Sequence, residues 1–127
     1  MMDALVDSTV IIHLLRRHPT TTLWFKELTT PLALTSITWL EIIYGAPNKA
    51  EQLRAEQLMG RLKLLFLTHI DQLWAMDTLK QLRLSKGISI NDCLIASIAM
   101  RLQIPIYTHN TKDFLRLLPE TLVLRLD

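Results

Sequence analysis

Short apolar runs alternate with longer helical segments along the whole chain, and this alternation constrains the fold more than any other sequence feature. Strands are predicted at residues 4–6, 32–35, 64–67, 104–108 and 122–124. Apolar spacing and capping residues predict helices at about 10–15, 21–28, 48–62, 71–87, 89–102 and 110–118, with Asn48 and Asp71 among the expected N-caps. A further helix opens at Ser36 or Thr38 and ends near Gly45 and Pro47. Buried strands separated by helices favour an α/β domain with a central, mainly parallel sheet of about five strands flanked by helices.

Length and composition agree with a single domain spanning residues 1–127. Half of the residues (50%) are hydrophobic and 20% are charged, which excludes general disorder. The longest uncharged segment, 28–40, is interrupted by Pro31 and falls short of the roughly 20 apolar residues of a membrane-spanning helix. No export signal is evident, so a cytoplasmic protein without membrane association is expected. The single cysteine, Cys93, is predicted to fill the core.

The placement of the acidic residues is more informative than the overall charge. The 14 Lys and Arg against 12 Asp and Glu leave a net charge of +2, which neither demands nor excludes nucleic acid as a partner. In a parallel α/β sheet the working cleft lies at the carboxyl ends of the strands, where the helix N-termini also lie. Four acids are predicted at that edge: Asp7, Glu41, Asp92 and Asp113.

Helix capping offers a simpler explanation for each of these acids taken alone. The pairs are Asp7 with the helix beginning near Val10, Glu41 with Thr38, Asp92 with Ser89, and Asp113 with Asn110. Glu41 fits this explanation least well, because it lies beside the apolar stripe of its helix, where an uncompensated charge is unfavourable. A shared purpose accounts better for four carboxylates at one edge of one sheet.

Carboxylates crowded into one cleft repel one another unless a cation neutralises them. Ligands that are all oxygen atoms favour a hard ion, Mg²⁺ or Mn²⁺, over zinc. Such an ion lowers the pKa of a bound water and stabilises the charge that develops when phosphorus is attacked. The residues therefore predict metal-dependent hydrolysis of phosphodiester bonds.

Four segments carry a family resemblance: 7–12, 36–45, 91–96 and 107–114. Together they resemble the PIN domain, and most closely the VapC-type toxins of bacterial and archaeal toxin–antitoxin pairs. The resemblance implies a three-layer sandwich and an endoribonuclease that requires Mg²⁺ or Mn²⁺. It implies catalytic and metal-binding roles for Asp7, Asp92, Glu41 and Asp113, with Asp7 and Asp92 as the firmest ligands. Thr9, Thr108 and Asn110 would be supporting polar residues, while His109 stands at a variable position and receives no role.

The resemblance also implies partners. Family members form homodimers, cleave structured RNA such as transfer or ribosomal RNA, and are neutralised by a VapB-type antitoxin whose C-terminal segment occupies the toxin's groove. Candidate RNA contacts are Arg83, Lys86, Lys112 and Arg116, for which solvated helix faces are the alternative explanation.

Other classes of protein fit less well. A haloacid dehalogenase-type phosphatase requires a second Asp where Thr9 stands, and a receiver domain requires an Asp where Thr68 and His69 stand. A PIN nuclease that is not a toxin, or a non-catalytic PIN-like module that binds RNA or protein, remains as the alternative. The intact set of four acids counts against the non-catalytic module.

Overall fold

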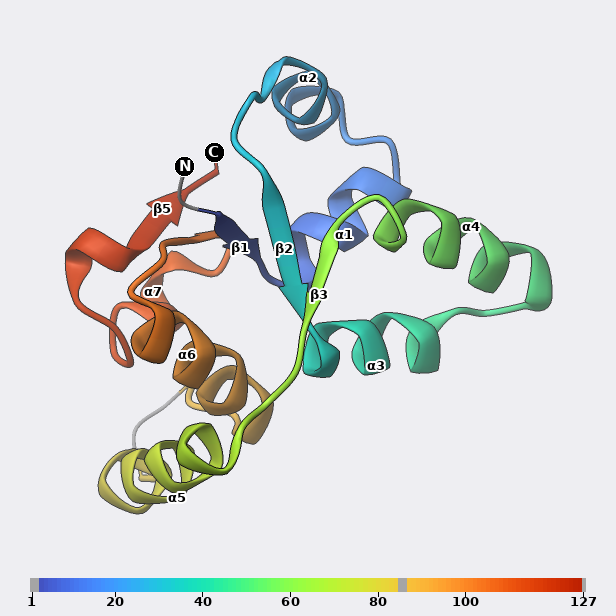
Figure 1. The fold of residues 1–127 in the computed structure, drawn as a ribbon. Coiled ribbons are helices and arrows are strands. Elements are labelled where there is room, and N and C mark those ends of the chain that lie inside the picture. Colours follow the sequence, from blue (N-terminus) through green and yellow to red (C-terminus); the bar gives the residue numbers. More distant parts are fainter. Residues whose placement is uncertain (1–2, 85–86, 127) are drawn as a thin grey trace.

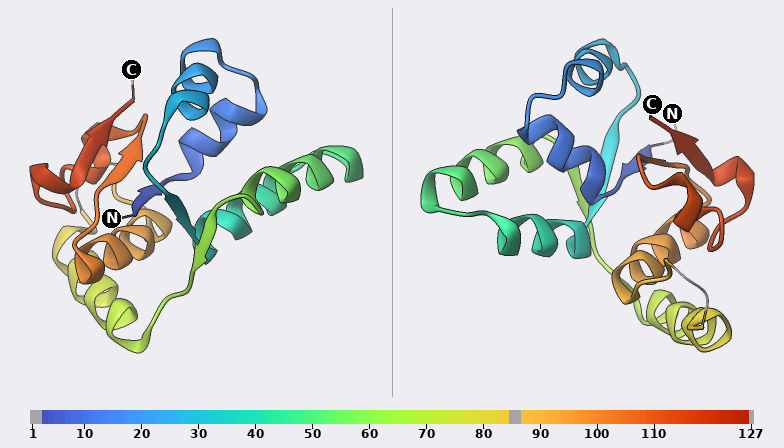
Figure 2. Two further views of the ribbon diagram at one scale, coloured as in Figure 1. Left: turned by 45° about the horizontal axis from the view of Figure 1, so that its top comes forward. Right: turned by 180° about the vertical axis from the view of Figure 1, so that it is seen from behind.

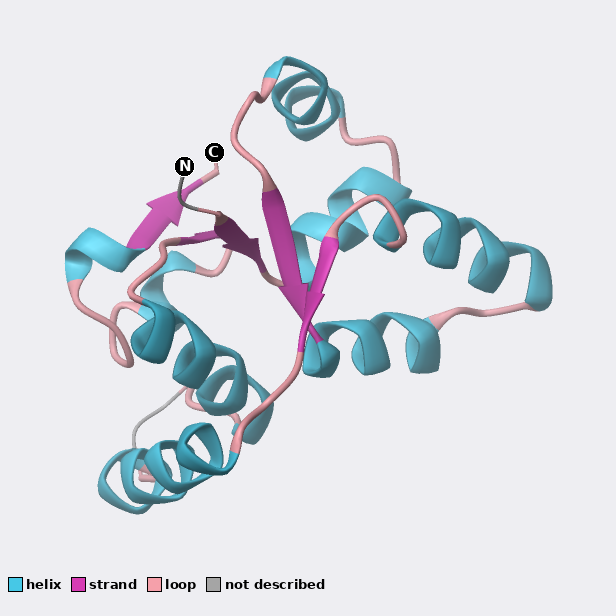
Figure 3. Cartoon of the chain, in the orientation of Figure 1, coloured by secondary structure: helices cyan, strands magenta, loops and turns pink. Residues whose placement is uncertain are grey.

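The computed structural model describes residues 3–84 and 87–126. Five strands form one central sheet in the order β3-β2-β1-β4-β5 (Figures 1 and 3). The strands are β1 (Ala4–Val6), β2 (Leu32–Thr35), β3 (Lys63–Leu65), β4 (Ile106–Thr108) and β5 (Val123–Arg125). Every pair of neighbouring strands is parallel, which confirms the predicted sheet.

Helices cover both faces of this sheet (Figure 2). They are α1 (Ser8–Leu15), α2 (Pro19–Glu27), α3 (Ser36–Gly45), α4 (Lys49–Met59), α5 (His69–Leu82), α6 (Ile90–Leu102) and α7 (Thr111–Phe114), followed by the short 3₁₀ helix η1 (Glu120–Leu122). The predicted three-layer α/β sandwich is therefore confirmed. Among the described residues, none of the helices combines the length and apolar character needed to cross a membrane.

Alternate residues of each strand point to opposite faces of the sheet and build two apolar cores. Val6 of β1 belongs to one core, together with Val10 of α1 and Met59 of α4. The neighbouring Leu5 belongs to the other core, which contains Cys93 of α6. Cys93 is buried, so the prediction that it fills the core is confirmed.

Helix α5 begins two residues earlier than predicted, because Asp71 is not its N-cap. Thr68 is the N-cap, and Asp71 is the third helical residue of a capping box in which its carboxylate accepts from the Thr68 amide at 2.8 Å. The other oxygen of Asp71 pairs with Arg101 of α6 at 2.7 Å. Asp71 thus fastens the beginning of α5 to the end of α6.

Several other boundaries differ from the prediction. Helix α4 ends at Met59, before Leu62, and β3 starts at Lys63 because its pairing with β2 begins there. Helix α7 ends at Phe114 and α5 at Leu82, so both are shorter than expected. Lys86, a predicted RNA contact, lies outside the described residues.

Candidate active site

Asp7 follows β1 directly and is 3% exposed. Its Oδ1 accepts hydrogen bonds from the Thr9 hydroxyl at 2.5 Å and the Val10 amide at 3.2 Å, and its Oδ2 accepts from the Thr108 hydroxyl at 2.6 Å. Burial raises the pKa of Asp7, and the hydrogen bonds from Thr108, Thr9 and two backbone amides offset only part of that rise. Asp7 therefore caps α1, as the simpler explanation required, and also places a carboxylate at the carboxyl end of β1.

Two threonine hydroxyls fix the orientation of Asp7. Thr9 Oγ1 accepts from the His109 amide at 3.1 Å, and Thr108 Oγ1 accepts from the Asn110 amide at 2.7 Å. Since each hydroxyl accepts from a backbone amide, its own proton is directed toward the Asp7 carboxylate. The structure thus brings Thr9 and Thr108 to the predicted position beside the acidic residues.

Glu41 of α3 is held by two residues that the sequence prediction missed. Ser8 donates to Glu41 Oε1 at 2.6 Å, and Asn91 donates to Oε2 at 3.1 Å. Both residues stand directly beside a predicted acid in the sequence, Ser8 after Asp7 and Asn91 before Asp92, and this adjacency is the signal that could have revealed them.

The alternative explanation for Glu41, a capping box with Thr38, is wrong. The N-cap of α3 is Thr35, whose hydroxyl accepts from the Thr38 amide at 3.1 Å. Helix α3 thus begins at Ser36, and Glu41 lies beyond the third helical position from which a capping box could form. Its carboxylate contacts Ser8 and Asn91 instead of the helix N-terminus.

Asp92 lies in the first turn of α6, where its amide donates to the N-cap Ser89 at 3.0 Å. Burial raises the pKa of Asp92 to about 6, with further contributions from the negative charges of Asp7, Asp113 and Glu41. The negative charges of Asp7, Asp113 and Glu41 therefore all act on Asp92, as expected for carboxylates at one edge of the sheet.

Asp113 of α7 is positioned by Asn110 and Gly87. Asn110 is the N-cap of α7 but makes no side-chain cap; its amide group donates instead to Asp113 Oδ2 at 2.8 Å. Gly87 has a φ of +84°, and a Cβ at this position would collide with Asp113 Oδ1. The close approach of backbone to carboxylate therefore requires glycine.

The four carboxylates are not neutralised by ion pairs between described residues. Those ion pairs are Arg54–Glu51, Lys63–Asp3 and Arg101–Asp71. In the same part of the chain, no three His, Cys, Asp or Glu side chains are close enough together to surround one metal ion. This spacing still suits Mg²⁺, which proteins commonly hold through one or two carboxylates while it keeps several waters.

The three described candidates for RNA contact flank this region in the sequence, but no contact with the acids is observed. Arg83 follows α5 and Lys112 lies on α7, and both are exposed. Arg116 is partly buried, and one of its terminal nitrogens has no hydrogen-bond partner within the described parts of the chain.

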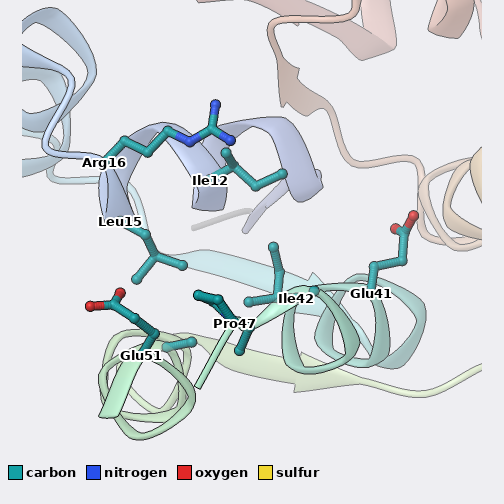
Figure 4. A pocket seen from close by; sticks show the side chains of 10 residues that line it. Ile12, Leu15, Arg16, Glu41, Ile42, Pro47 and Glu51 are labelled. Carbon is teal, nitrogen blue, oxygen red and sulfur yellow. The ribbon is translucent and has the colours of Figure 1, made fainter. Parts of the chain in front are cut away.

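A pocket of about 400 Å³ lies between α1, α3 and α4 (Figure 4). Much of its lining is apolar and includes Ile12, Leu15 and Ile42. Glu41 stands at one end of the pocket, and Arg16 and Glu51 stand at the other. Of the four acids, Glu41 is the one that lines this pocket.

The fold and the four acids define the class of protein. The chain belongs to the PIN-domain family, whose sequence profile matches residues 4–117. Comparison with curated protein sequences finds no match.

Solved structures of toxin–antitoxin proteins share the fold over most of the chain. VapBC-1 from nontypeable Haemophilus influenzae is 28% identical, with a TM-score of 0.77 over 99% of this chain and 98% of that chain. DNA-bound VapBC from Salmonella typhimurium is 21% identical, with a TM-score of 0.79 over 100% of both chains. VapC20 from Mycobacterium tuberculosis, described as a sarcin-ricin loop cleaving toxin, is 12% identical, with a TM-score of 0.64 over 84% of this chain and 87% of that chain. The resemblance to VapC-type toxins is thereby confirmed.

Proposed function

We propose that this protein is a metal-dependent endoribonuclease and the toxin of a VapBC-type toxin–antitoxin pair. One observation carries the proposal: carboxylates from four elements gather closely enough for Asp7, Asp113 and Glu41 to raise the pKa of Asp92, yet none of the four is in an ion pair with a described residue. Such an arrangement destabilises the fold unless a cation binds. Membership of the PIN-domain family supports a nuclease.

Asp7 and Asp92 are the residues proposed to hold Mg²⁺ or Mn²⁺, with Glu41 and Asp113 beside them. Their carboxylate oxygens are the donors that hard divalent ions prefer. When bound, such an ion supplies a water of lowered pKa and stabilises the negative charge that develops at phosphorus. Thr9 and Thr108 keep both oxygens of Asp7 aligned for this role.

Glu41 and Asp113 are proposed to orient the attacking water. Ser8 and Asn91 each donate to one oxygen of Glu41, which holds the carboxylate while leaving lone pairs that can accept a proton from water. Asn110 restrains Asp113 Oδ2 in the same way. The proton of the attacking water would pass to a Glu41 oxygen, and the ribose oxygen that leaves as the phosphodiester bond breaks would take a proton from solvent.

RNA is the proposed substrate, and cationic side chains outside the acidic residues are proposed to bind its phosphates. Among the described residues these are Arg83, Lys112 and Arg116; Lys86 is a further candidate from the sequence. The sarcin-ricin loop named for VapC20 supports structured RNA, ribosomal or transfer RNA, as the target class.

A VapB-type antitoxin is the proposed partner, and the pocket between α1, α3 and α4 is its proposed binding site. The Haemophilus influenzae and Salmonella typhimurium relatives are VapBC proteins, which supports an antitoxin. The apolar lining from Ile12, Leu15 and Ile42 suits apolar antitoxin side chains, and Glu41 suits a basic one. An antitoxin bound there would cover the acidic residues and block RNA.

A homodimer is also proposed, on the basis of large apolar side chains at the surface. Tyr44 of α3 is 94% exposed, and Leu40, Ile70, Leu73 and Met76 are each at least half exposed. A cytoplasmic location is proposed as well, because the proposed RNA substrate and antitoxin would both be met there.

Cleavage of RNA by the purified protein, freed of any antitoxin, tests this proposal. We expect cleavage only with Mg²⁺ or Mn²⁺, and Asp92→Asn should reduce it to background while the protein remains folded. Asp77→Asn on the exposed face of α5 is the matched control and should cleave like the wild type. Undiminished cleavage in excess EDTA would exclude the metal mechanism, and no cleavage with either metal would favour a binding module.

A further inference from the structure

Three of the four histidines gather beside the acidic residues. His13 lies in α1, His18 is the N-cap of α2, and His109 follows β4. The His13 ring centroid lies 3.8 Å from that of His109 and 4.7 Å from that of His18. The buried Thr21 hydroxyl joins the other two rings, because it lies 3.1 Å from His18 Nδ1 and 3.3 Å from His109 Nε2. We call these three residues the histidine cluster.

The histidine cluster is connected to Asp7 by one short chain of hydrogen bonds. The backbone amide of His109 donates to Thr9 Oγ1 at 3.1 Å, and the Thr9 hydroxyl donates to Asp7 Oδ1 at 2.5 Å. If the His109 backbone moves, Thr9 loses the amide that directs its proton toward Asp7. The backbone of His109 is therefore joined to Asp7 through the Thr9 hydroxyl.

The observed hydrogen bonds require a neutral His18. Its Nδ1 accepts from the Thr21 amide at 3.3 Å and thereby caps α2. A proton on Nδ1 would turn this acceptor into a donor and remove the cap. The N-terminus of a helix also repels a positive charge, since it carries the positive end of the helix dipole. Protonation of His18 thus opposes the conformation in which α2 is capped.

His13 also resists protonation. Its Nδ1 is buried and has no hydrogen-bond partner among the described residues, so a proton there would be an unpaired donor. Burial lowers the pKa of His13, and the positive charges of His109, His18 and Arg16 lower it further. Asp7 acts in the opposite direction, and these are the charged and titratable groups that act on His13 from α1, α2 and the end of β4.

We propose that the histidine cluster is a pH-sensitive clamp that positions Thr9 and Asp7 while its rings are neutral and releases them when protons bind. The effect of the clamp on catalysis rests on the proposed nuclease function. The pH-dependent movement of the histidine cluster does not depend on that function. When protons bind at lower pH, they add like charges to rings whose centroids lie 3.8 Å and 4.7 Å from that of His13. The α2 cap opens, His109 withdraws from Thr9, and Asp7 loses its alignment.

Imidazole and amide NMR of the metal-free protein between pH 8 and 5 tests the clamp without any nuclease assay. His69 of α5 lies outside the cluster and provides the reference ring. We expect the ring signals of His13, His18 and His109 to change together over this range, and the backbone amide signals of His109 and Thr9 to shift with them. Independent titration of the three rings, or amide signals that do not follow them, would overturn the proposal.

His18→Asn separates a pH-sensitive clamp from a merely structural cluster, because Asn is a strong N-cap that does not take up a proton in this range. The variant should move the titration of His13 and His109 and largely abolish the amide shifts, whereas His69→Asn should change neither. If RNA cleavage is observed, its rate in the wild type and in His18→Asn should be compared at pH 7.5 and after acidification. Acidification should reduce the rate of the wild type by a factor about tenfold larger than that of His18→Asn. Both proteins retain Asp92, so equal acid losses would contradict the clamp.

Discussion

Thr108 and Asp7 are 101 positions apart in the sequence, yet the Thr108 hydroxyl donates a 2.6 Å hydrogen bond to Asp7 Oδ2. The contact forms because β1 and β4 are parallel neighbours at the centre of the sheet, with Val6 opposite Tyr107 in register. Asp7, which directly follows β1, and Thr108, the last residue of β4, therefore meet at the carboxyl edge. The candidate active site is built on the most buried part of the sheet.

Thr108→Val should weaken metal binding without unfolding the protein. The substitution removes a hydroxyl that donates to Asp7 and accepts from the Asn110 amide. Loss of a residue that orients a metal ligand typically reduces metal affinity or activity about 10- to 100-fold. Titration with Mn²⁺ measures the affinity. Thr38→Val is the matched control, because Thr38 is equally buried and its hydroxyl has no partner among the described residues; an equal loss in both variants would contradict the role of Thr108.

Asp92→Asn should stabilise the metal-free protein at pH 7.5. The pKa of Asp92 rises from 3.8 to about 6 on folding, so the native state favours the protonated acid and the wild type loses stability as the pH rises through this window. Removing the charge should raise the free energy of unfolding at this pH by about 1 kcal/mol. This figure is smaller than the full pKa shift would give, because the side chain is partly solvated and its interactions are screened.

Thermal unfolding at several pH values checks this prediction. The difference in Tm between Asp92→Asn and the wild type should be largest above pH 7 and should vanish near pH 4. Addition of Mn²⁺ should raise the Tm of the wild type more than that of the variant. A variant that is less stable than the metal-free wild type at pH 7.5 would contradict the mutual repulsion of the four acids.

Gly87→Ala should impair the site through Asp113. A methyl group at this position collides with the Asp113 carboxylate, and the φ of +84° is strained for alanine. We expect RNA cleavage to fall about tenfold. Gly45→Ala is the control, since nothing lies within 4 Å of a Cβ there.

A double-mutant cycle shows whether Gly87→Ala acts through Asp113. In an Asp113→Ala background, Gly87→Ala should lower activity little further. A full additional loss in that background would mean that Gly87 acts on some other part of the site.

Ala46→Trp should make the protein insensitive to the proposed antitoxin. Ala46 lines the pocket between α1, α3 and α4, and a tryptophan there would fill the space proposed for antitoxin side chains. Expression of the wild type alone should arrest growth, and co-expression of the neighbouring small gene should restore it. Ala46→Trp should arrest growth even with that gene, whereas Ala50→Trp on the exposed face of α4 should be rescued. Rescue of both variants would place the antitoxin elsewhere.

The positions of the four acids at the ends of strands and the starts of helices could be predicted from the sequence, because they depend on local features. Asp7 follows an apolar strand and Asp92 follows a helix-capping serine, and both signals lie within a few residues. Parallel strand order then brings such positions to one edge. The same local information did not identify Ser8 and Asn91 as the residues that hold Glu41, because those contacts join segments 33 and 50 positions apart.

At the N-termini of α3 and α5, more than one polar residue of the sequence could serve as the N-cap. Thr38 and Glu41 match a capping box, but Thr35 ends β2 in an extended conformation and takes the N-cap position instead. Asp71 is a good N-cap type, yet Thr68 precedes it by three residues and completes a capping box with it. The histidine cluster could not be predicted from the sequence, because its rings come from three segments that meet only in the folded protein.

The most direct test of the central claim is the location of Mn²⁺ by anomalous diffraction from crystals of the metal-loaded protein. We expect an anomalous peak bounded by the carboxylates of Asp7 and Asp92, with metal–oxygen distances of about 2.0–2.3 Å. The peak should be absent from crystals of Asp92→Asn grown under the same conditions. A protein that cleaves RNA yet shows no manganese between Asp7 and Asp92 would contradict the account.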